Sequence, residues 1–531
     1  MNDAQVMNLA GLLAQTARLY PHRPGLITDD REWTWSEIDA RVNAMVGALR
    51  RLGLAKGDRI LVHSRNNLQL FESCWAAFRM GCVWVPTNCR LTPPEVGYLG
   101  SSSGARAMIY EPGSQAHVDT VRAQSSALEH VICIGEPRAG EHGYEQLMLG
   151  GAADDCEPAE VARDDPLWFF YTSGTTGKPK AGVLTHGQMA FVVTNHLAEL
   201  IPGTDERDCS IAVAPLSHGA GIHALLNVAR GAATVLPPGD RLDPETIWRL
   251  VERHRVSNLF TVPTIVKMLV EHPAVDEYDH SSLRFMIYAG APMYRSDQKF
   301  ALRKLGKVLV QYFGLGEVTG CITVLTPEMH SLDDDDPEFP LGTCGRPRVG
   351  MDIAILDEQL QRVPCGVVGE ICVRGPAVFE GYHDNAAATA KALRGGWFHT
   401  GDLGRLDDRG RLYITGRESD MYISGGSNVY PREVEEVLST HPGVAEVAVL
   451  GVPDPKWGEV GVAVVVRREG AQPFDAEALI AYLDGRCARY RWPRQVFFWD
   501  ALPKSGYGKV TKNDVKRLLV TRGEIELASP P

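Results

Sequence analysis

Short apolar segments alternate with helix-length amphipathic segments through most of the chain. The first segments of the β type are DRILVHS, CVWVPTN, ARAMIY and HVICIG, between residues 58 and 135. After residue 209 the alternation resumes with SIAVAPL, AATVLPP, SNLFTV, RFMIYAGA and VLVQYFG. Continuous apolar runs joined by helices are typical of largely parallel sheets with both faces covered. The pattern therefore predicts an α/β fold with two stacked halves.

The pattern changes in the last third of the chain. The short segments MDIAILD and GEICVRG predict a β-rich subdomain, and residues 402–426 predict a hairpin followed by a linker. The segments PREVEEVLS, VGVAVVVR and DAEALIAYLDG then predict a compact α+β unit of about a hundred residues. We expect a large N-terminal domain over residues 1–417, a hinge over 418–420 and a small mobile C-terminal domain over 421–531.

Composition and charge restrict the class of protein. Lys and Arg number 54 against 66 Asp and Glu, a net charge of −12, which disfavours general nucleic-acid binding. The 11 cysteines contain no C-x-x-C pair, which argues against zinc and disulfides and favours a reducing cytosol. No signal peptide or run of membrane-spanning length is expected, so we predict a soluble, cytoplasmic protein without a transmembrane segment.

The segment YTSGTTGKPK, residues 171–180, is the first candidate for chemistry. Its glycines, hydroxyls and lysines suit a polyphosphate, because they let backbone N–H groups approach closely and add donors and charge. It is not a Walker loop, since Gly174 and Gly177 are only three apart and Lys178 precedes Pro179. We expect a flexible phosphate-binding loop after a strand; a polar surface turn is the alternative.

Two other segments suggest sites that we reject. Ser217 and His218 resemble the serine–histidine pair of a hydrolase. We place both residues on a strand, where neighbouring side chains point to opposite faces, so the two cannot form that pair. Four aspartates at 333–336 could suggest a metal site. A solvated charge run is the better interpretation of them.

Five ordered motifs carry a resemblance over nearly the whole chain. YTSGTTGKPK, QYFGLGEVTG, GWFHTGDLG, GRESDMYISGGSNVYPREVE and PKSGYGK together resemble the acyl-adenylate-forming superfamily, which includes acyl-CoA synthetases, firefly luciferase and peptide-synthetase adenylation domains. The resemblance implies a two-step reaction. A carboxylate attacks the α-phosphate of ATP to give an acyl-adenylate and pyrophosphate, and a thiol then displaces AMP.

The resemblance also implies a nucleotide site. Glu317 matches the position that holds Mg²⁺, a hard cation suited to carboxylate and phosphate oxygens. Asp402 would accept hydrogen bonds from the ribose hydroxyls, and Arg417 would add donors nearby. The remaining residues implied to bind ATP are Thr172, Ser173, Gly174, Thr175, Thr176, Gly177, Lys178, Gly290, Ala291, Pro292, Tyr312, Phe313 and Gly314.

The second step implies coenzyme A and a moving domain. By resemblance, Lys509 bridges the carboxylate and the α-phosphate during adenylation, which requires the small domain to close over the large one. The domain then rotates about the hinge at Ser419, where many relatives carry Asp or Lys. The residues implied to lie near CoA are Gly425, Gly426, Trp457 and Tyr490.

The carboxylic acid is expected beside the loop that begins at His218. The implied pocket residues are His218, at the entrance, followed by Gly219, Ala220, Ala289, Gly314, Leu315 and Gly316. No charged side chain stands out there except Glu317, and several positions lack bulk, so we expect a bulky or long apolar acid. Many relatives have Thr where this chain has Gly316, so a hydroxyl contact to the adenylate is lost.

The leading hypothesis is an acid:CoA ligase that forms AMP and pyrophosphate. A stand-alone adenylation enzyme that loads an acyl carrier protein is the alternative, and luciferase-like oxidation is a remote third because fold alone does not decide chemistry. A nucleotide-binding regulator without catalysis is disfavoured by the retained Glu317, Asp402, Arg417 and Lys509. A homodimer and the identity of the acid stay open.

Overall fold

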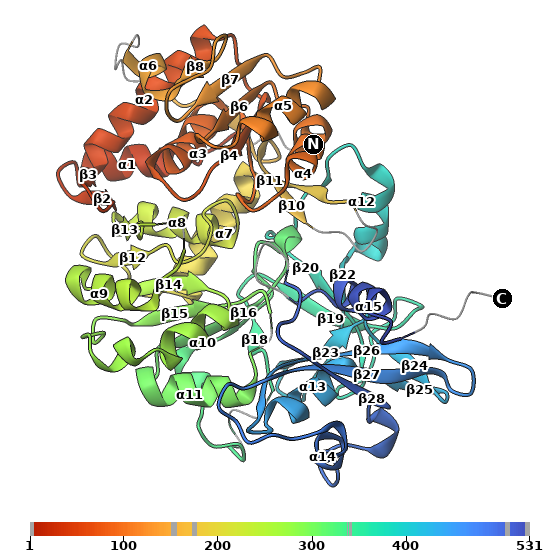
Figure 1. The fold of residues 1–531 in the computed structure, drawn as a ribbon. Coiled ribbons are helices and arrows are strands. Elements are labelled where there is room, and N and C mark those ends of the chain that lie inside the picture. The colour runs from red at the N-terminus through yellow and green to blue at the C-terminus, as the bar shows by residue number, and fades with distance from the viewer. Residues whose placement is uncertain are drawn as a thin grey trace.

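The protein is described by a computed structural model with a large N-terminal part and a smaller C-terminal part (Figure 1). The structure describes residues 5–149, 157–172, 178–239, 241–291, 293–336, 338, 342–504 and 510–525. The predicted α/β architecture, with two stacked halves, a β-rich subdomain and an α+β C-terminal unit, is confirmed.

The first half contains an eight-stranded sheet. Across the sheet its strands are β21 (Gly381–Tyr382), β11 (Lys180–Thr185), β10 (Pro166–Thr172), β5 (Val83–Pro86), β4 (Arg59–His63), β6 (Ala107–Tyr110), β7 (His130–Cys133) and β8 (His142–Gly143). From β10 to β8 neighbouring strands run parallel, whereas β11 is antiparallel to both β10 and β21. The short strands β1 (Gln5–Val6) and β9 (Val161–Ala162) pair separately.

The second half contains a nine-stranded sheet. Across it lie β18 (Arg346–Pro347), β17 (Thr323–Leu325), β16 (Leu309–Phe313), β15 (Phe285–Tyr288), β14 (Asn258–Thr261), β12 (Cys209–Ile211), β13 (Ala233–Val235), β2 (Pro24–Ile27) and β3 (Glu32–Thr34). The strands from β16 to β2 run parallel, and the outer strands are antiparallel.

Two smaller sheets follow, the first antiparallel and the second mixed. The β-rich subdomain consists of β19 (Asp352–Leu356), β20 (Gly369–Arg374), β22 (Phe398–Leu406) and β23 (Leu412–Arg417). The C-terminal unit contains β25 (Ser427–Val429), β24 (Tyr422–Ser424), β27 (Gly458–Arg467), β26 (Val444–Asp454) and β28 (Gln495–Trp499), of which β28 runs parallel to β27.

Residues 402–426 belong to two hairpins rather than to a hairpin and a linker. The hairpin β22–β23 ends at Arg417, and residues 422–429 form the hairpin β24–β25 of the C-terminal sheet. The expectation of a linker through residue 426 is therefore wrong. The two glycines of this segment form a tight turn, and they are what made it resemble a linker in the sequence.

Helices cover the sheets, and a single hydrophobic core joins the two halves. Ile60 of β4, Trp168 of β10 and Val310 of β16 belong to that core. The helices are α1 (Gly11–Leu19), α2 (Trp35–Arg51), α3 (Leu68–Met80), α4 (Pro93–Ser103), α5 (Gln115–Gln124), α6 (Tyr144–Leu149), α7 (His186–Glu199), α8 (Gly219–Arg230), α9 (Pro244–His254), α10 (Pro263–Glu271), α11 (Arg295–Leu305), α12 (Ala386–Ala392), α13 (Pro431–Ser439), α14 (Ala476–Ala481) and α15 (Lys512–Thr521).

Helices α7 and α8 lie between the two large sheets (Figure 1). Most of their residues are buried, as are nearly all residues of α3. Helices that are buried on nearly all sides need apolar residues around the whole circumference, which explains the dense apolar sequence of α3. This central layer places the first turn of α8 beside both sheets.

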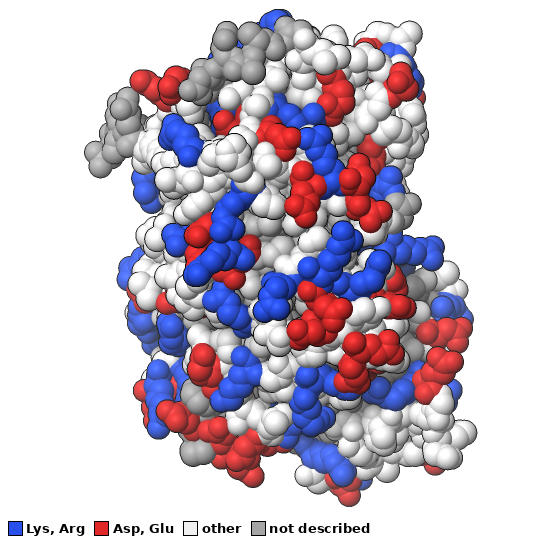
Figure 2. Space-filling view, turned by 90° about the vertical axis from the view of Figure 1, so that its left-hand side faces the viewer, with Lys and Arg blue, Asp and Glu red and all other residues white. Residues whose placement is uncertain are grey.

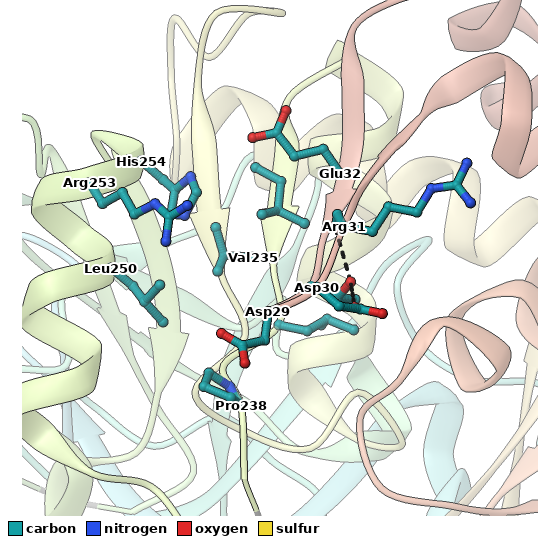
Figure 3. Close-up of a pocket in the computed structure, with 12 residues that line it drawn as sticks. Asp29, Asp30, Arg31, Glu32, Val235, Pro238, Leu250, Arg253 and His254 are labelled. Atoms are coloured by element: carbon teal, nitrogen blue, oxygen red, sulfur yellow. Dashed lines mark hydrogen bonds between the residues drawn. The ribbon is translucent and has the colours of Figure 1, made fainter.

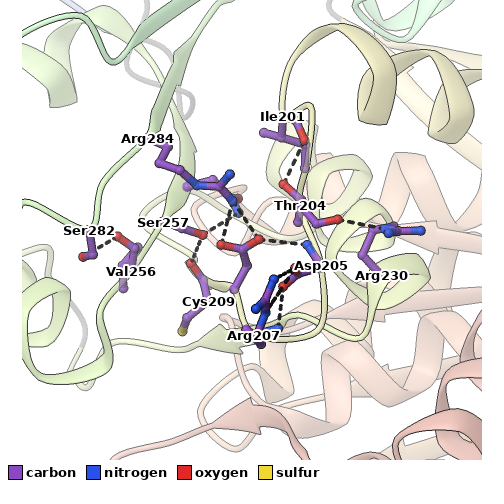
Figure 4. Close-up of polar contacts among 12 residues, drawn as sticks. Ile201, Thr204, Asp205, Arg207, Cys209, Arg230, Val256, Ser257, Ser282 and Arg284 are labelled. Carbon is purple, nitrogen blue, oxygen red and sulfur yellow. Dashed lines mark hydrogen bonds and ion pairs between the residues drawn. The ribbon is translucent and has the colours of Figure 1, made fainter.

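The amino ends of β12, β14 and β15 are fixed by polar contacts (Figure 4). Arg284 donates to both carboxylate oxygens of Asp208 at 2.7 Å, and the Ser257 hydroxyl donates to the Cys209 carbonyl at 3.1 Å. The Arg284 side chain is 41% exposed, so the ion pair itself contributes less than about 1 kcal/mol. These contacts align the amino ends of the strands. The carboxyl ends lie at the opposite edge of the sheet, where a ligand can bind.

Surface charge is mixed in sign. On the face shown in Figure 2, acidic and basic side chains are interspersed. Within the aspartate run, Asp334 forms ion pairs with Arg295 and Lys299 of α11, so this carboxylate is paired rather than simply solvated. In the described part of the chain, no helix combines the length and apolar character needed to cross a bilayer.

Several buried histidines make stability depend on pH. Burial lowers the pKa of His63, His186 and His330 to about 4 from 6.5. Above pH 6.5 these imidazoles are neutral in both the folded and the unfolded chain, and their burial has no pH-dependent cost. As pH falls from 6.5 towards 4, the unfolded chain takes up protons that the folded chain does not, and stability is lost.

We predict that His63→Gln reduces the acid sensitivity of folding. Between pH 7.5 and 5.0 the wild-type free energy of unfolding should fall by about 2 kcal/mol more than that of the variant, because Gln does not titrate. Urea unfolding at the two pH values measures this, with the exposed His22→Gln as the control. Equal losses in wild type and His63→Gln would contradict the prediction.

Candidate active site at the carboxyl edge of the second sheet

Three predicted segments follow parallel strands of the nine-stranded sheet. Residues 212–218 follow β12, residues 289–291 follow β15, and residues 314–317 follow β16. These strands run in one direction, so their carboxyl ends lie at the same edge of the sheet. That edge is where open α/β sheets bind ligands. The fold thus brings together segments that are about a hundred residues apart.

Glu317 is a buried carboxylate at this edge, with 6% of its surface exposed. Its Oε1 accepts hydrogen bonds from the hydroxyls of Thr172 and Tyr382, both at 2.9 Å. Burial, and then the adjacent Glu317, raise the pKa of Tyr382, which keeps this phenol protonated as a donor. Glu317 Oε2 accepts no hydrogen bond from any residue that the structure describes. One carboxylate oxygen is anchored and the other is available to a ligand.

The lack of a side chain at Gly316 has a steric cause. A β-carbon at this position would lie 2.7 Å from Phe170 Cδ1 and 2.9 Å from Thr172 Cγ2. Phe170 is 4% exposed, and its ring lies 4.3 Å from the ring of His218. Here the aromatic ring occupies the space into which a threonine side chain would extend. Gly316 is therefore a packing requirement as well as a lost hydroxyl.

Ser217 and His218 do not lie on a strand, and that expectation is wrong. Strand β12 ends at Ile211, and both residues belong to the turn before α8, where His218 is the N-cap residue. The apolar run before them favoured a longer strand, but the chain turns into the helix first. The half-buried His218 packs its ring against Phe170, which places it at the junction of both sheets.

The segments implied to contact adenine differ in exposure. Ala289 is buried, Gly290 is exposed with a φ of 83°, and Ala291, Phe313 and Leu315 are half-buried. Tyr312 is buried, while a β-carbon on Gly314 would meet Gly320 Cα at 2.4 Å. Gly314 is thus required by the close approach of two backbone segments.

Asp402 and Arg417 face each other across the hairpin β22–β23. They are register partners, and Arg417 Nε lies 3.2 Å from Asp402 Oδ1. The Asp402 side chain is 8% exposed and that of Arg417 is 51% exposed. The pair therefore presents a buried acceptor and an exposed donor at one end of the subdomain, next to residues 418–420.

The C-terminal candidates are exposed, and two of them are in contact. Gly425 and Gly426 have φ angles of 57° and 81°, the values of a two-residue hairpin turn that strongly prefers glycine. A β-carbon on Gly425 would lie 2.7 Å from Trp457 Cε3. Trp457 and Tyr490 are 39% and 47% exposed. The turn conformation alone accounts for both glycines, apart from any role towards CoA.

Some predicted residues cannot be placed. Lys178 is described, with its Nζ 5.4 Å from the centroid of the Tyr98 ring. The residues that lie outside the described part of the chain are Ser173, Gly174, Thr175, Thr176, Gly177, Pro292 and Lys509. Thr172 and Lys180, which flank the first loop, are register partners in the antiparallel pair β10–β11.

A surface depression of about 190 Å³ lies elsewhere (Figure 3). It is lined by the β2–β3 turn, the end of β13 and α9, including Asp29, Arg31 and His254. Strands β15, β14 and β12 separate β13 from β16 in the sheet. No predicted site residue lines this depression, so it is not part of the candidate active site.

The sequence did not reveal three contributors to the site. Tyr382 acts through its contact with Glu317 from 65 residues away, and Phe170 acts through its packing against Gly316 from more than a hundred residues away. His223, one turn into α8, is buried against His196 of α7, Phe260 of β14 and Tyr312 of β16. The only sequence signal for Phe170 was the apolar run PLWFF, which ends directly before YTSGTTGKPK.

Two family profiles match the chain. The profile of the AMP-binding enzyme family matches residues 13–383. The profile of the AMP-binding enzyme C-terminal domain matches residues 433–509. Together they cover the two large sheets and most of the C-terminal unit.

Individual relatives match over nearly their full length. A feruloyl-CoA synthase from Amycolatopsis is 36% identical over 94% of this chain and 97% of its own. An indoleacetate–CoA ligase from Aromatoleum aromaticum is 32% identical over 98% of this chain and 100% of its own. The solved o-succinylbenzoate CoA synthetase from Bacillus subtilis, in complex with its acyl-adenylate intermediate, is 30% identical, with a TM-score of 0.83 over 97% of this chain and 98% of its own.

We predict that Gly316→Thr lowers the rate of adenylation about tenfold or more, because overpacking against Phe170 displaces the neighbours of Glu317. Phe170→Leu in the same chain should restore part of the loss by making room. Pyrophosphate exchange measures both variants, with Gly47→Thr on α2 as the control, since a β-carbon there meets nothing closer than 3.5 Å. If Gly316→Thr raised activity, the lost hydroxyl would be the dominant effect instead.

Proposed function

The chain belongs to the AMP-binding enzyme family and is an AMP-forming acyl-CoA ligase, and we propose that its substrate is a bulky, largely apolar carboxylic acid. The enzyme joins this acid to CoA through an acyl-adenylate. The observation that carries the proposal is the pair of hydrogen bonds that fixes the Glu317 carboxylate between the two large sheets. It holds a buried carboxylate, a metal-binding type of group, next to Gly316 and the Phe170 ring that packs against this glycine.

The pocket wall supports a large acid. Gly219 has no side chain, so Phe260 packs directly against the start of α8; a β-carbon there would lie 2.8 Å from Phe260 Cε1. The rings of Phe170 and His218 form a second aromatic contact, with centroids 4.3 Å apart. Rings that face small residues suit a flat apolar body. The relatives named for ferulate and indoleacetate act on acids of this kind.

Mg²⁺ and ATP fit the residues at this edge. We propose that Glu317 holds Mg²⁺ through Oε2, while Thr172 and Tyr382 keep the carboxylate oriented. The cation would neutralise phosphate charge when an anionic carboxylate approaches. Asp402 would accept from the ribose hydroxyls, with Arg417 beside it as a donor. Residues 172–178 would wrap the β- and γ-phosphates, and residues 289–292 with Tyr312, Phe313 and Gly314 would enclose adenine.

The second step involves the small domain. We propose that Lys509 stabilises charge during adenylation, and that rotation about residues 418–420 then presents Gly425, Gly426, Trp457 and Tyr490 to CoA. The exposure of Trp457 and Tyr490 supports a role in binding a ligand. The alternative acceptor of the acyl group is an acyl carrier protein. A homodimer and a cytoplasmic location are separate parts of the proposal.

We predict that pyrophosphate release depends on bulky acids and thioester formation on CoA. Aromatic or ten-carbon acids should show a kcat/KM at least about tenfold above that of acetate and propionate, because only they fill the pocket. Parallel reactions with and without CoA, and with a phosphopantetheinylated carrier protein, identify the acceptor. Faster turnover of acetate would overturn the substrate class, and no release with any acid would overturn the activity.

We predict that Lys509→Ala separates the two half-reactions. Pyrophosphate exchange should fall by roughly two to three orders of magnitude, the scale of losing one preorganised donor. Conversion of a supplied acyl-adenylate and CoA to thioester should stay near normal. Lys504→Ala is the matched control, since its ammonium is engaged by Glu446 at 2.9 Å. A parallel fall in both half-reactions would contradict the proposed role of Lys509.

A further inference from the structure

One face of α8 continues inward from the pocket wall. Gly219 and His223 are four residues apart, so they lie on the same face of the helix, one turn from each other. Both contact Phe260: the glycine position abuts its ring, and the His223 ring stacks on it with centroids 4.4 Å apart. His223 therefore lies one turn beyond Gly219 on the same side of α8, against the same Phe260 ring.

His223 is buried without a hydrogen-bond partner. It is 5% exposed, and neither its Nδ1 nor its Nε2 has a partner among the described residues. Native proteins keep unpaired buried polar groups mainly where a ligand or water completes them. Phe260 stacks on the imidazole with centroids 4.4 Å apart, and the centroid of the Tyr312 ring lies 5.8 Å away. The unsatisfied atoms are at the edge of the ring.

A second histidine, His196 of α7, has the same deficiency. Its ring centroid lies 5.3 Å from that of His223, it is fully buried, and its Nε2 has no partner among the described residues. Its Nδ1 faces Arg348 Nη2 at 3.2 Å and Cys321 Sγ at 3.3 Å. A guanidinium is always a donor, so Nδ1 is the acceptor and the ring proton is on Nε2. His196 thus presents an unused N–H.

Both imidazoles are neutral at the pH of the cell. Burial, and then the charge of Arg348, lower the pKa of His223 to about 3 and hold the pKa of His196 well below its usual value. A neutral His223 offers one N–H and one lone pair. With the N–H of His196, the pair presents two donors and one acceptor. A hydroxyl group has two lone pairs and one hydrogen, which matches this set.

We propose that His223 and His196 form a hydroxyl-binding subsite at the inner end of the acid pocket. The inference rests on the proposed function, and it narrows the substrate class to acids that carry a hydroxyl group remote from the carboxylate. The ring centroids of the two histidines lie 5.3 Å apart, so one oxygen beside both rings can reach an edge nitrogen of each.

The test compares matched acids within one enzyme. Cinnamic acid and its ortho, meta and para monohydroxy derivatives are assayed by pyrophosphate exchange. For wild type we expect kcat/KM for the para or meta derivative to exceed that for cinnamic acid at least about tenfold, because a site built for a hydroxyl rejects the analogue that lacks it. The ortho derivative, with its hydroxyl near the carboxylate, should show no such gain.

His223→Phe should reduce the ratio between the hydroxylated acid and cinnamic acid to within about threefold, because it keeps a ring but removes both nitrogens. The ratio is internal to each variant, so partial misfolding does not change it. His117→Phe is the matched control: its Nδ1 is also buried and unpaired, but it lies on α5, and its ratio should equal that of wild type.

Three outcomes would overturn the subsite. Wild type could show no preference for any hydroxylated acid, which would mean that water or nothing completes the histidines. His223→Phe could retain the full preference, or His117→Phe could lose it equally. If no acid of either kind supported exchange, the proposed function would fail instead, so the two failures are distinguishable.

Discussion

The site depends on one carboxylate that is hydrogen-bonded from two directions. Glu317 follows β16 of the nine-stranded sheet, while its partners Thr172 and Tyr382 belong to β10 and β21 of the eight-stranded sheet. The same two bonds therefore orient a metal-binding type of oxygen and join the two halves of the large domain. Buried hydroxyl donors stabilise the carboxylate and leave its negative charge in place, whereas a paired arginine would neutralise that charge. The charge stays available to a cation.

Glycines and aromatic rings are matched around this carboxylate. Phe170 occupies the space beside Gly316, and Phe260 occupies the space beside Gly219. Each pair replaces a side chain on one segment by a ring from a distant one, so the ring fills the space beside the bare backbone and makes this wall rigid. The side chain that is absent at Gly316 is thus replaced by the packing of Phe170 from another strand, and not by a new polar contact.

A second group of predicted site residues lies at the end of the β22–β23 hairpin. Asp402 and Arg417 are fixed opposite each other by the β22–β23 register, immediately before the segment that joins the C-terminal unit. Met421 N–H and Asp420 N–H both bond to the Arg417 carbonyl, so the chain turns at once after this pair. We propose that a change in this turn moves the small domain while Asp402 stays in the sheet. This separation is what a two-step ligase requires.

The sequence by itself determined the fold class, the order of the strands along the chain and the family. Continuous apolar runs at β4 to β7 and β12 to β16 fix the parallel halves because they must be covered on both faces, and the ordered motifs fix the chemistry because each motif is local. It also marked Glu317, Asp402 and Arg417. It misplaced Ser217 and His218, because a local apolar run gives no signal for where a strand ends and a helix cap begins.

Only the tertiary structure decided which distant residues complete the site. Tyr382 contacts Glu317 from 65 residues away, and Phe170 explains Gly316 from across the two sheets. His223 and His196 became an unsatisfied pair only when α7 and α8 were packed together. Hydrogen-bond satisfaction and steric fit depend on which side chains share a space, and that is set by packing between segments rather than by the pattern within any one of them.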